Sequence, residues 1–220
     1  MTAIDNLIEG YKEFKEEYLH EDNAKYLQSA SHGQSPKVMV IGCSDSRVNP
    51  AMLTNASLGE LFTVNNVANI VPPFKKGNDT HHSTSSAVEY AVKSLKIENI
   101  IIMGHSKCGG IKALMEGSRD NKKEDSNKEY SFIAPWMDIV SEVRDEIIDK
   151  NKDLPQEEKN CLCEKKAILV SLNNLMTFPW VKSAVEDNKL ALHAWYFEIS
   201  TGIIYRYDNQ KQDFVDILSE

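Results

Sequence analysis

Two short segments of the sequence combine residue types that bind metals or act as nucleophiles. The first, VMVIGCSDSR, ends an apolar run at Cys43 and places Asp45 and Arg47 at alternate positions after it. The second, MGHSKCGG, places His105 three residues before Cys108. A thiolate in such a place can serve as a nucleophile, a redox centre or a metal ligand. Which of these chemistries applies depends on where the expected strands and helices place the two segments.

Each segment follows an apolar run that is typical of a buried parallel strand. The runs of this kind are 37–42 and 98–105, and LFTVNN at 61–66 is expected to form a further strand between them. A helix expected over 83–96 precedes the last of them, and strand, helix, strand in this order favours a parallel sheet with helices on both faces. Functional groups gather at the carboxyl ends of strands in open α/β sheets. We therefore expect Cys43, His105 and Cys108 to converge there.

The rest of the chain completes an α/β fold. Apolar residues at helical spacing predict an N-terminal helical arm within residues 1–30, and further helices around 133–147 and 155–175. Residues 117–131 are polar and resemble a loop, and two alternating runs about a Thr-Gly turn at 191–208 predict a late strand or hairpin. The length suits one domain over 1–220, with a mostly parallel central sheet flanked by helices.

Composition excludes several classes of function. The formal net charge of -8 argues against nucleic acid as a partner, because a phosphate backbone requires a clustered positive surface. The start of the chain lacks the pattern of an export signal, and the apolar runs are too short to span a bilayer. We therefore expect a cytoplasmic protein that binds no membrane. Four cysteines are too few for a disulfide scaffold, so metal binding or catalysis explains a specially placed cysteine better.

Zinc suits the three converging ligands. Thiolate sulfur and imidazole nitrogen form tetrahedral zinc sites, and three protein ligands with one open position are typical of catalytic zinc. Cys161 and Cys163, spaced at i and i+2 on an expected helix, face different directions and are poor candidates for a fourth ligand. A buried cysteine can also be a simple small hydrophobe. A Cys-His nucleophile pair with His105 as the base is a further alternative, but it leaves Cys108 unexplained.

The neighbours of the cysteines fit a catalytic site as well. Asp45 and Arg47 can form a charge-assisted pair in which the guanidinium keeps the carboxylate ionised beside the open metal position. The alternative is a surface ion pair of little energetic value. Gly109 and Gly110 begin an expected helix, where free backbone amides can receive an anion, although a plain strand-to-helix turn explains them about equally well.

Together these motifs resemble the beta-class carbonic anhydrases. The resemblance rests on CSDSRV at 43–48, GHSKCGGIKAL at 104–114 and the intervening LGELFTVNNVANIVPP and SAVEYAVKSLKIENI. It is strong over about 34–116 and looser over most of the chain. Cys-x-Asp-x-Arg with a distant His-x-x-Cys-Gly-Gly is a highly specific combination.

The resemblance implies an activity and a role for each matching residue. The reaction is the reversible hydration of carbon dioxide to bicarbonate and a proton, with one zinc ion per chain. Cys43, His105 and Cys108 match the zinc ligands, and Asp45 with Arg47 matches the family's catalytic dyad. The plant-type branch is the more similar one, because Gln34, Phe62 and Tyr90 match residues that line its substrate pocket, beside the amide of Gly109. Since two thiolates cancel the charge of the metal, we expect activity to rise toward alkaline pH.

One departure and two alternatives accompany the resemblance. Asn65 replaces an arginine that helps some members to hold bicarbonate at a regulatory site, so such inhibition is not expected here. The alternatives are a hydrolase of a related linear substrate, such as carbon disulfide, and a noncatalytic zinc-binding module. An intact Asp45–Arg47 pair argues against the second, since a structural zinc site needs neither residue. His81 and His82 are not assigned as a proton shuttle.

The resemblance also implies a homodimer or a dimer-based oligomer. In this arrangement the N-terminal helices embrace the partner, and the active site lies near the interface. The apolar stripe within residues 4–18 is compatible with such a contact, and equally with packing on the chain's own core.

Overall fold

The structure is a computed structural model, and it describes residues 1–19, 33–76, 82–117 and 132–219. Its centre is a six-stranded sheet in the order β2-β1-β3-β4-β5-β6. The strands are β1 (Val38–Cys43), β2 (Leu61–Asn66), β3 (Asn99–His105), β4 (Ala191–Glu198), β5 (Ile203–Asp208) and β6 (Asp213–Asp216). β1 pairs in parallel with β2 and β3, and β3 with β4, whereas β5 and β6 join in antiparallel pairs. The carboxyl ends of β1, β2, β3 and β4 consequently meet at one edge of the sheet.

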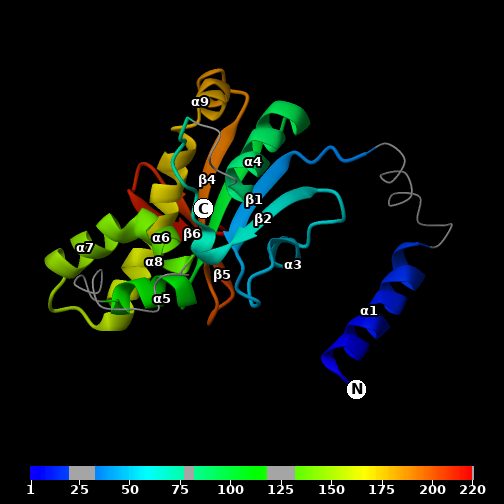
Figure 1. Ribbon diagram of the computed structural model, residues 1–220, viewed down its shortest axis with the longest axis horizontal. Helices are drawn as coiled ribbons and strands as arrows, with labels where there is room; N and C mark the ends of the chain where they lie inside the picture. Colours follow the sequence, from blue (N-terminus) through cyan, green and yellow to red (C-terminus); the bar gives the residue numbers. More distant parts are fainter. Residues whose placement is uncertain (20–32, 77–81, 118–131, 220) are drawn as a thin grey trace.

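Helices cover the sheet unequally (Figure 1). Helices α4 (Ser83–Tyr90), α8 (Gln156–Leu175) and α9 (Pro179–Glu186) pack on one face and share a core with Met39, Ile41, Ile100 and Ile102. The other face carries a smaller core that includes Val40, Ile101 and Met103, with Leu53 of the short helix α3 (Pro50–Thr54) against it. Because side chains alternate along β1 and β3, each strand contributes residues to the cores on both faces of the sheet.

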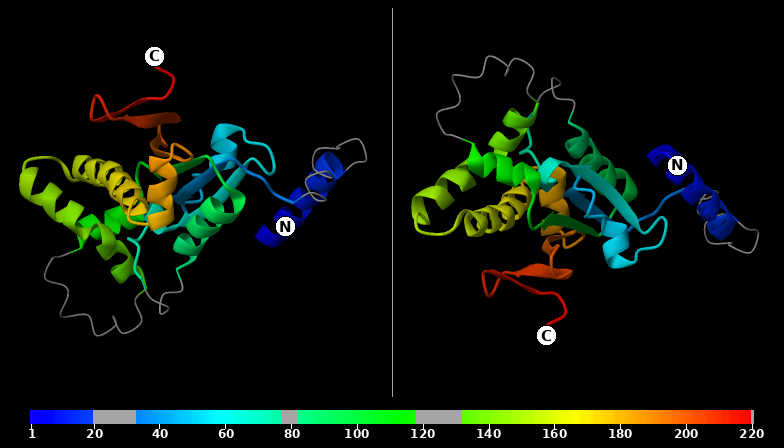
Figure 2. Two further views of the ribbon diagram at one scale, coloured as in Figure 1. Left: turned by 90° about the horizontal axis from the view of Figure 1, so that it is seen from above. Right: turned by 90° about the horizontal axis from the view of Figure 1, so that it is seen from below.

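A second group of helices surrounds the carboxyl edge of the sheet. It comprises α5 (Gly109–Glu116), α6 (Ile133–Met137), the 3-10 turn η4 (Asp138–Val140) and α7 (Ser141–Lys150). Their apolar side chains form one core with Cys43, Cys108, Cys163 and Ala167. α7 and α8 lie side by side, as Figure 2 shows. The candidate ligands are thus built into a packed core beside α8.

The predicted elements agree with the structure except for short ones. The α/β class, the three parallel strands and the hairpin around Gly202 are confirmed, and β1 and β3 are buried as predicted, whereas β2 is only partly buried. α3, α9 and β6 were not predicted, and the helix expected over 83–96 changes to a π-helical turn, η2 (Ala91–Leu95), before it ends at Lys96. The later part of the predicted N-terminal arm lies outside the described residues.

The described part of the arm is the helix α1 (Ala3–Tyr18), which begins with a capping box formed by Thr2 and Asp5. None of the residues in α1 is buried, and Figure 1 shows it apart from the sheet. Ile4, Leu7, Ile8 and Tyr11 expose their apolar side chains to solvent. This stripe has no covering surface within the part of the chain that the structure describes.

None of the described helices has both the length and the apolar character that a membrane crossing requires.

Candidate metal centre

Cys43, His105 and Cys108 meet at the carboxyl edge of the sheet, as the sequence predicts. Cys43 is the last residue of β1, His105 is the last residue of β3, and Cys108 directly precedes α5. All three residues are buried, and their ligand atoms lie within 4.8 Å of one another. The parallel pairing of β1 with β3 is what brings these two distant parts of the chain together.

The imidazole of His105 is oriented as a metal ligand. Its Nδ1 lies 2.9 Å from the carbonyl oxygen of Ser106. A carbonyl can only accept, so Nδ1 carries a proton, and in the neutral imidazole that a metal requires Nε2 keeps its lone pair. Nε2 is buried and has no hydrogen-bond partner among the described residues. A buried nitrogen of this kind is costly unless it binds something, and a metal ion satisfies it.

The donor set fits zinc. Zinc–sulfur and zinc–nitrogen bonds of about 2.0 to 2.3 Å place tetrahedral ligand atoms about 3.3 to 3.8 Å apart. The three ligand atoms all lie within 4.8 Å of one another, a bound that the spacing of a zinc site satisfies. Among the described residues the group consists of two sulfurs and one nitrogen, and three protein ligands with one open position are the arrangement of a catalytic zinc site.

The sulfurs of Cys43 and Cys108 interact strongly with each other. The pKa of Cys43 falls to about 4, mainly because the Cys108 side chain hydrogen-bonds to it, while burial opposes the change. The pKa of Cys108 is raised by its hydrogen bond with Cys43 and by burial. One thiolate therefore forms readily and the second only with difficulty, unless a cation enters between the two sulfurs.

Asp45 and Arg47 form the pair that the sequence predicts. Arg47 Nε donates to Asp45 Oδ1 over 2.9 Å, and Nη2 donates to Oδ2 over 2.8 Å. The backbone N–H of Arg47 adds a third bond to Oδ1, over 3.0 Å. These bonds from Arg47 hold the pKa of Asp45 well below its usual range, although burial opposes them. The carboxylate stays charged, with Oδ2 4.0 Å from His105 Nε2.

The turn between β3 and α5 is fixed from several sides. Ser106 N–H donates to the carbonyl of Phe197, and Ser106 Oγ donates to Glu198 Oε1 over 2.8 Å. Lys107 adopts a left-handed conformation with φ of 57°, and its carbonyl accepts from Arg47 Nη2 over 3.3 Å. The backbone is held where a lysine alone would not favour it. These contacts aim Cys108 back toward Cys43.

A second turn supports Cys43. In the 3-10 turn η1 (Val67–Asn69), Ala68 and Asn69 both have positive φ, at 62° and 48°. The side-chain amide of Asn66 holds the two ends of this turn together, because it accepts from Ile70 N–H and donates to Ile70 O, each over 2.9 Å. In this conformation the backbone N–H of Ala68 helps to lower the pKa of the Cys43 thiol. The local strain at Ala68 thus accompanies a contact to a candidate ligand.

The structure separates the expected pocket residues into two places. Gly109, the first residue of α5, adjoins the cluster. Phe62 and Tyr90 contact each other, with ring centroids 6.0 Å apart. Phe62 pairs with Met39, four positions before Cys43, which is roughly 13 Å along the strand. Gln34 is exposed and precedes the amino end of β1, so these three residues do not surround the cluster of their own chain.

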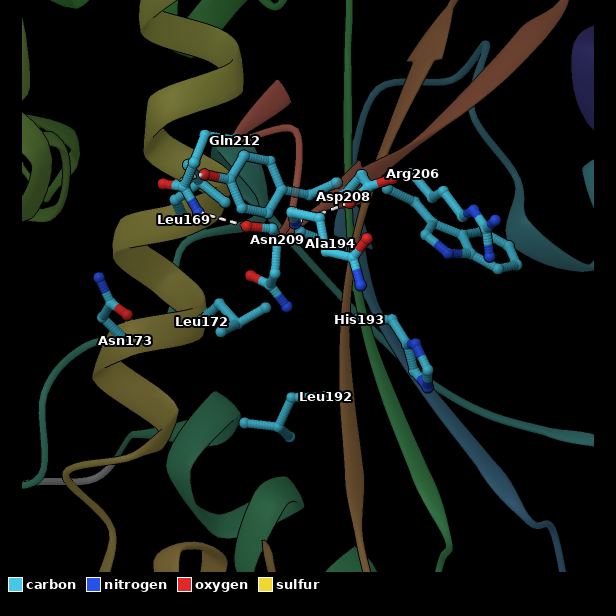
Figure 3. A pocket seen from close by; sticks show the side chains of 13 residues that line it. Leu169, Leu172, Asn173, Leu192, His193, Ala194, Arg206, Asp208, Asn209 and Gln212 are labelled. Carbon is cyan, nitrogen blue, oxygen red and sulfur yellow. Dashed lines mark hydrogen bonds between the residues drawn. The ribbon is translucent and has the colours of Figure 1, made fainter. Parts of the chain in front are cut away.

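A large pocket lies elsewhere on the surface, between α8 and the strands β4 and β5 (Figure 3). Its volume is about 710 Å³. Leu169 and Leu172 line it on one side, with His193 of β4 and Arg206 of β5 on the other. None of the cluster residues lines it, so size alone does not locate the chemistry of this protein.

Other residues that shape the site had not been predicted. They are Asn66, Ser106, Glu164 and Glu198, all of which bind the backbone or a side chain beside a candidate ligand. Ser106 and Asn66 lie inside the motifs of the sequence. Glu164 and Glu198 come from distant elements, and no local pattern marks them.

Comparisons with known proteins agree with this geometry. The family model described as carbonic anhydrase matches residues 38–204. Beta carbonic anhydrase 3 of Arabidopsis thaliana is 38% identical over 92% of this chain and 76% of its own length. A carbonic anhydrase of Synechocystis sp. is 34% identical over 96% of this chain and 74% of its own length.

Solved structures give the same result. The beta-carbonic anhydrase CcaA superimposes with a TM-score of 0.86 at 32% identity, covering 98% of this chain and 100% of its own. A tetrameric beta-carbonic anhydrase of Sordaria macrospora gives a TM-score of 0.73 at 26% identity, over 93% of each chain. With its family model, its relatives and its cluster of two cysteines and one histidine, the chain belongs to the beta-carbonic anhydrase family.

Proposed function

We propose that this protein is a carbonic anhydrase that catalyses the reversible hydration of carbon dioxide with one zinc ion per chain. The observation that carries the proposal is the Cys43–His105–Cys108 cluster with the ionised Asp45–Arg47 pair beside it. Cys43 and Cys108 would hold the zinc ion through sulfur and His105 would hold it through Nε2. Bound there, zinc would supply Lewis acidity and a hydroxide nucleophile from water.

The remaining roles belong to side chains around the open position. Asp45 offers a hydrogen-bond acceptor that orients the attacking oxygen, and Arg47 prevents a proton from staying on that carboxylate. The Gly109 N–H, at the start of the eight-residue helix α5, would donate a hydrogen bond to an oxygen of the product bicarbonate. These assignments follow from the ordinary chemistry of the groups: a buried imidazole, two sulfurs and a carboxylate with a bidentate guanidinium partner.

We further propose that the working unit is a homodimer or a dimer-based oligomer. Tyr90 is 47% exposed, and the exposed stripe of α1 lacks a covering surface among the described residues. Because Phe62, Tyr90 and Gln34 lie away from the cluster of their own chain, a role for them in substrate binding requires the site of a second copy. The relative from Sordaria macrospora is tetrameric. The free cysteines suit the reducing cytoplasm as the place of action.

The test combines zinc content with activity. Wild type and Asp45→Asn are purified, zinc per chain is measured, and carbon dioxide hydration is followed by stopped flow with a pH indicator. We expect about one zinc in both proteins, activity in wild type that rises from pH 6 toward pH 9, and a large loss in Asp45→Asn. Wild-type protein that contains zinc but does not hydrate carbon dioxide would refute the proposed reaction.

A further inference from the structure

Glu164 is a buried carboxylate that the proposed reaction does not use. It lies on α8 and exposes only 4% of its surface. Glutamate is rarely buried to this extent, because removing its charge from water is costly unless hydrogen bonds compensate. None of the ion pairs seen in the described segments includes Glu164. The hydrogen bonds of Glu164 must therefore explain why its carboxylate can be buried.

Both oxygens of Glu164 accept a hydrogen bond from a buried neutral donor. Oε1 accepts from the backbone N–H of Cys108 over 2.9 Å. Oε2 accepts from the hydroxyl of Tyr196 on β4, also over 2.9 Å. Tyr196 exposes only 2% of its surface, and its oxygen lies 3.6 Å from Cys161 Sγ on the same helix as Glu164. The carboxylate thus connects a candidate metal ligand, the adjacent strand and α8.

The bond to Cys108 completes the fixing of the turn after β3. Ser106 is held by β4, and the carbonyl of Lys107 is held by Arg47. Cys108 is the last residue of this turn, and it has no side-chain cap of its own at the start of α5. Without Glu164, the backbone N–H of Cys108 would be buried without the side-chain acceptor that it has among the described residues.

We propose that Glu164 is a positioning residue that holds the backbone of Cys108 so that its sulfur stays at metal-binding distance from Cys43 and His105. This inference rests on the proposed zinc site. Groups that orient metal ligands typically change metal affinity by about 10- to 100-fold when they are removed. Glu164 binds the backbone N–H of Cys108 and does not bind its sulfur, and the hydroxyl of Tyr196 holds the carboxylate in place.

Three variants and a matched control test the proposal through zinc binding. Glu164→Ala removes both bonds, Glu164→Gln keeps an oxygen that can accept from the Cys108 N–H, and Tyr196→Phe removes one donor. The control is Ser171→Ala, since Ser171 is equally buried on α8 but accepts from the backbone N–H of Val71 over 3.1 Å. Zinc affinity is measured by competition with a chromophoric chelator, and the geometry by the thiolate-to-metal charge-transfer band of the cobalt-substituted protein.

The inference predicts a different zinc affinity for each variant. Glu164→Ala should bind zinc about 10- to 100-fold more weakly and alter the cobalt band. Glu164→Gln should recover most of the affinity, Tyr196→Phe should lose about threefold to tenfold, and Ser171→Ala should behave as wild type.

Wild-type zinc affinity and an unchanged cobalt band in folded Glu164→Ala would overturn the inference, as would Glu164→Gln binding zinc no better than Glu164→Ala. If Glu164→Ala does not fold, as judged by circular dichroism, Tyr196→Phe decides, and unchanged zinc affinity in that variant overturns the inference. Failure of the proposed function would differ, because it would appear in the wild type as absence of zinc or of carbon dioxide hydration.

Discussion

Replacing Arg47 with lysine tests whether the Asp45–Arg47 ion pair serves stability or activity. Lysine keeps the positive charge, but as a point charge it cannot bind both oxygens of Asp45 as the guanidinium does over 2.9 and 2.8 Å. The Arg47 side chain is 49% exposed, so the pair contributes only about 0 to 1 kcal/mol to stability. For a chain of this size, the melting temperature should fall by no more than about 4 °C.

The effect on activity should be much larger. A carboxylate that is no longer held from both sides can rotate away from the position where it orients the attacking oxygen, and small misplacements of this kind reduce rates by up to about 100-fold. We expect kcat/KM to fall about 10- to 100-fold in Arg47→Lys, which corresponds to about 1.4 to 2.7 kcal/mol in the barrier. Zinc content should not change, because Arg47 is not a ligand.

Stopped-flow hydration, zinc analysis and differential scanning calorimetry on the same preparations measure these quantities. Arg144→Lys is the matched control, since Arg144 forms an ion pair over 2.7 Å with Asp145 on α7. It should leave kcat/KM unchanged. A fall of less than about threefold in Arg47→Lys would refute the assigned role, and so would a fall that the control reproduces.

Other substitutions test the ligands, the packing behind them and a histidine of β4. Cys43→Ser should lose zinc by metal analysis while Cys161→Ser keeps it, because a serine hydroxyl is a poor replacement for a zinc-binding thiolate. Gly104→Ala should lower the free energy of unfolding by about 1 to 3 kcal/mol, since its Cβ would lie 2.6 Å from Ile168 Cδ1. Chemical denaturation should show that Ile168→Ala and Gly104→Ala together cost less than their sum. Burial lowers the pKa of His193. Its contribution to stability is therefore present above the unfolded pKa of about 6.5 and lost as the pH falls toward the folded value. His193→Gln should reduce the loss of denaturation midpoint between about pH 7 and pH 5, and an unchanged slope would contradict this assignment.

Most of the sheet and of the candidate metal centre can be predicted from the sequence, because both depend on strong local signals. Continuous apolar runs identify β1 and β3, and the rule that parallel strands align their carboxyl ends is enough to bring Cys43 and His105 together. The short elements α3, α9 and β6 lack such signals. The five residues of α3 are too few to show a helical period, although Asn49 caps it and Pro50 occupies its first turn.

Contacts between distant elements are the part that could not be predicted. Glu164 lies in an ordinary helical pattern, and only the packing of α8 against α5 shows that its carboxylate reaches the backbone of Cys108. Phe62 and Tyr90 present the opposite case. Their resemblance to pocket residues identifies their types, but the register of β2 against β1 places Phe62 near the other end of the strand, where Tyr90 of α4 contacts it. Tertiary geometry, not residue type, decides both questions.

The anchoring of the turn after β3 has a consequence for the order in which the protein matures during synthesis. All three candidate ligands have been synthesised once the ribosome has passed Cys108, but Phe197 and Glu164, which hold the turn, are made later. A nascent chain therefore presents the ligands before it can fix them. If the metal binds the completed site and not the unfolded chain, it stabilises the folded state and not the unfolded one. Durable metal capture should thus coincide with the arrival of α8 and β4, and loss of the metal should accompany the unfolding of these two elements.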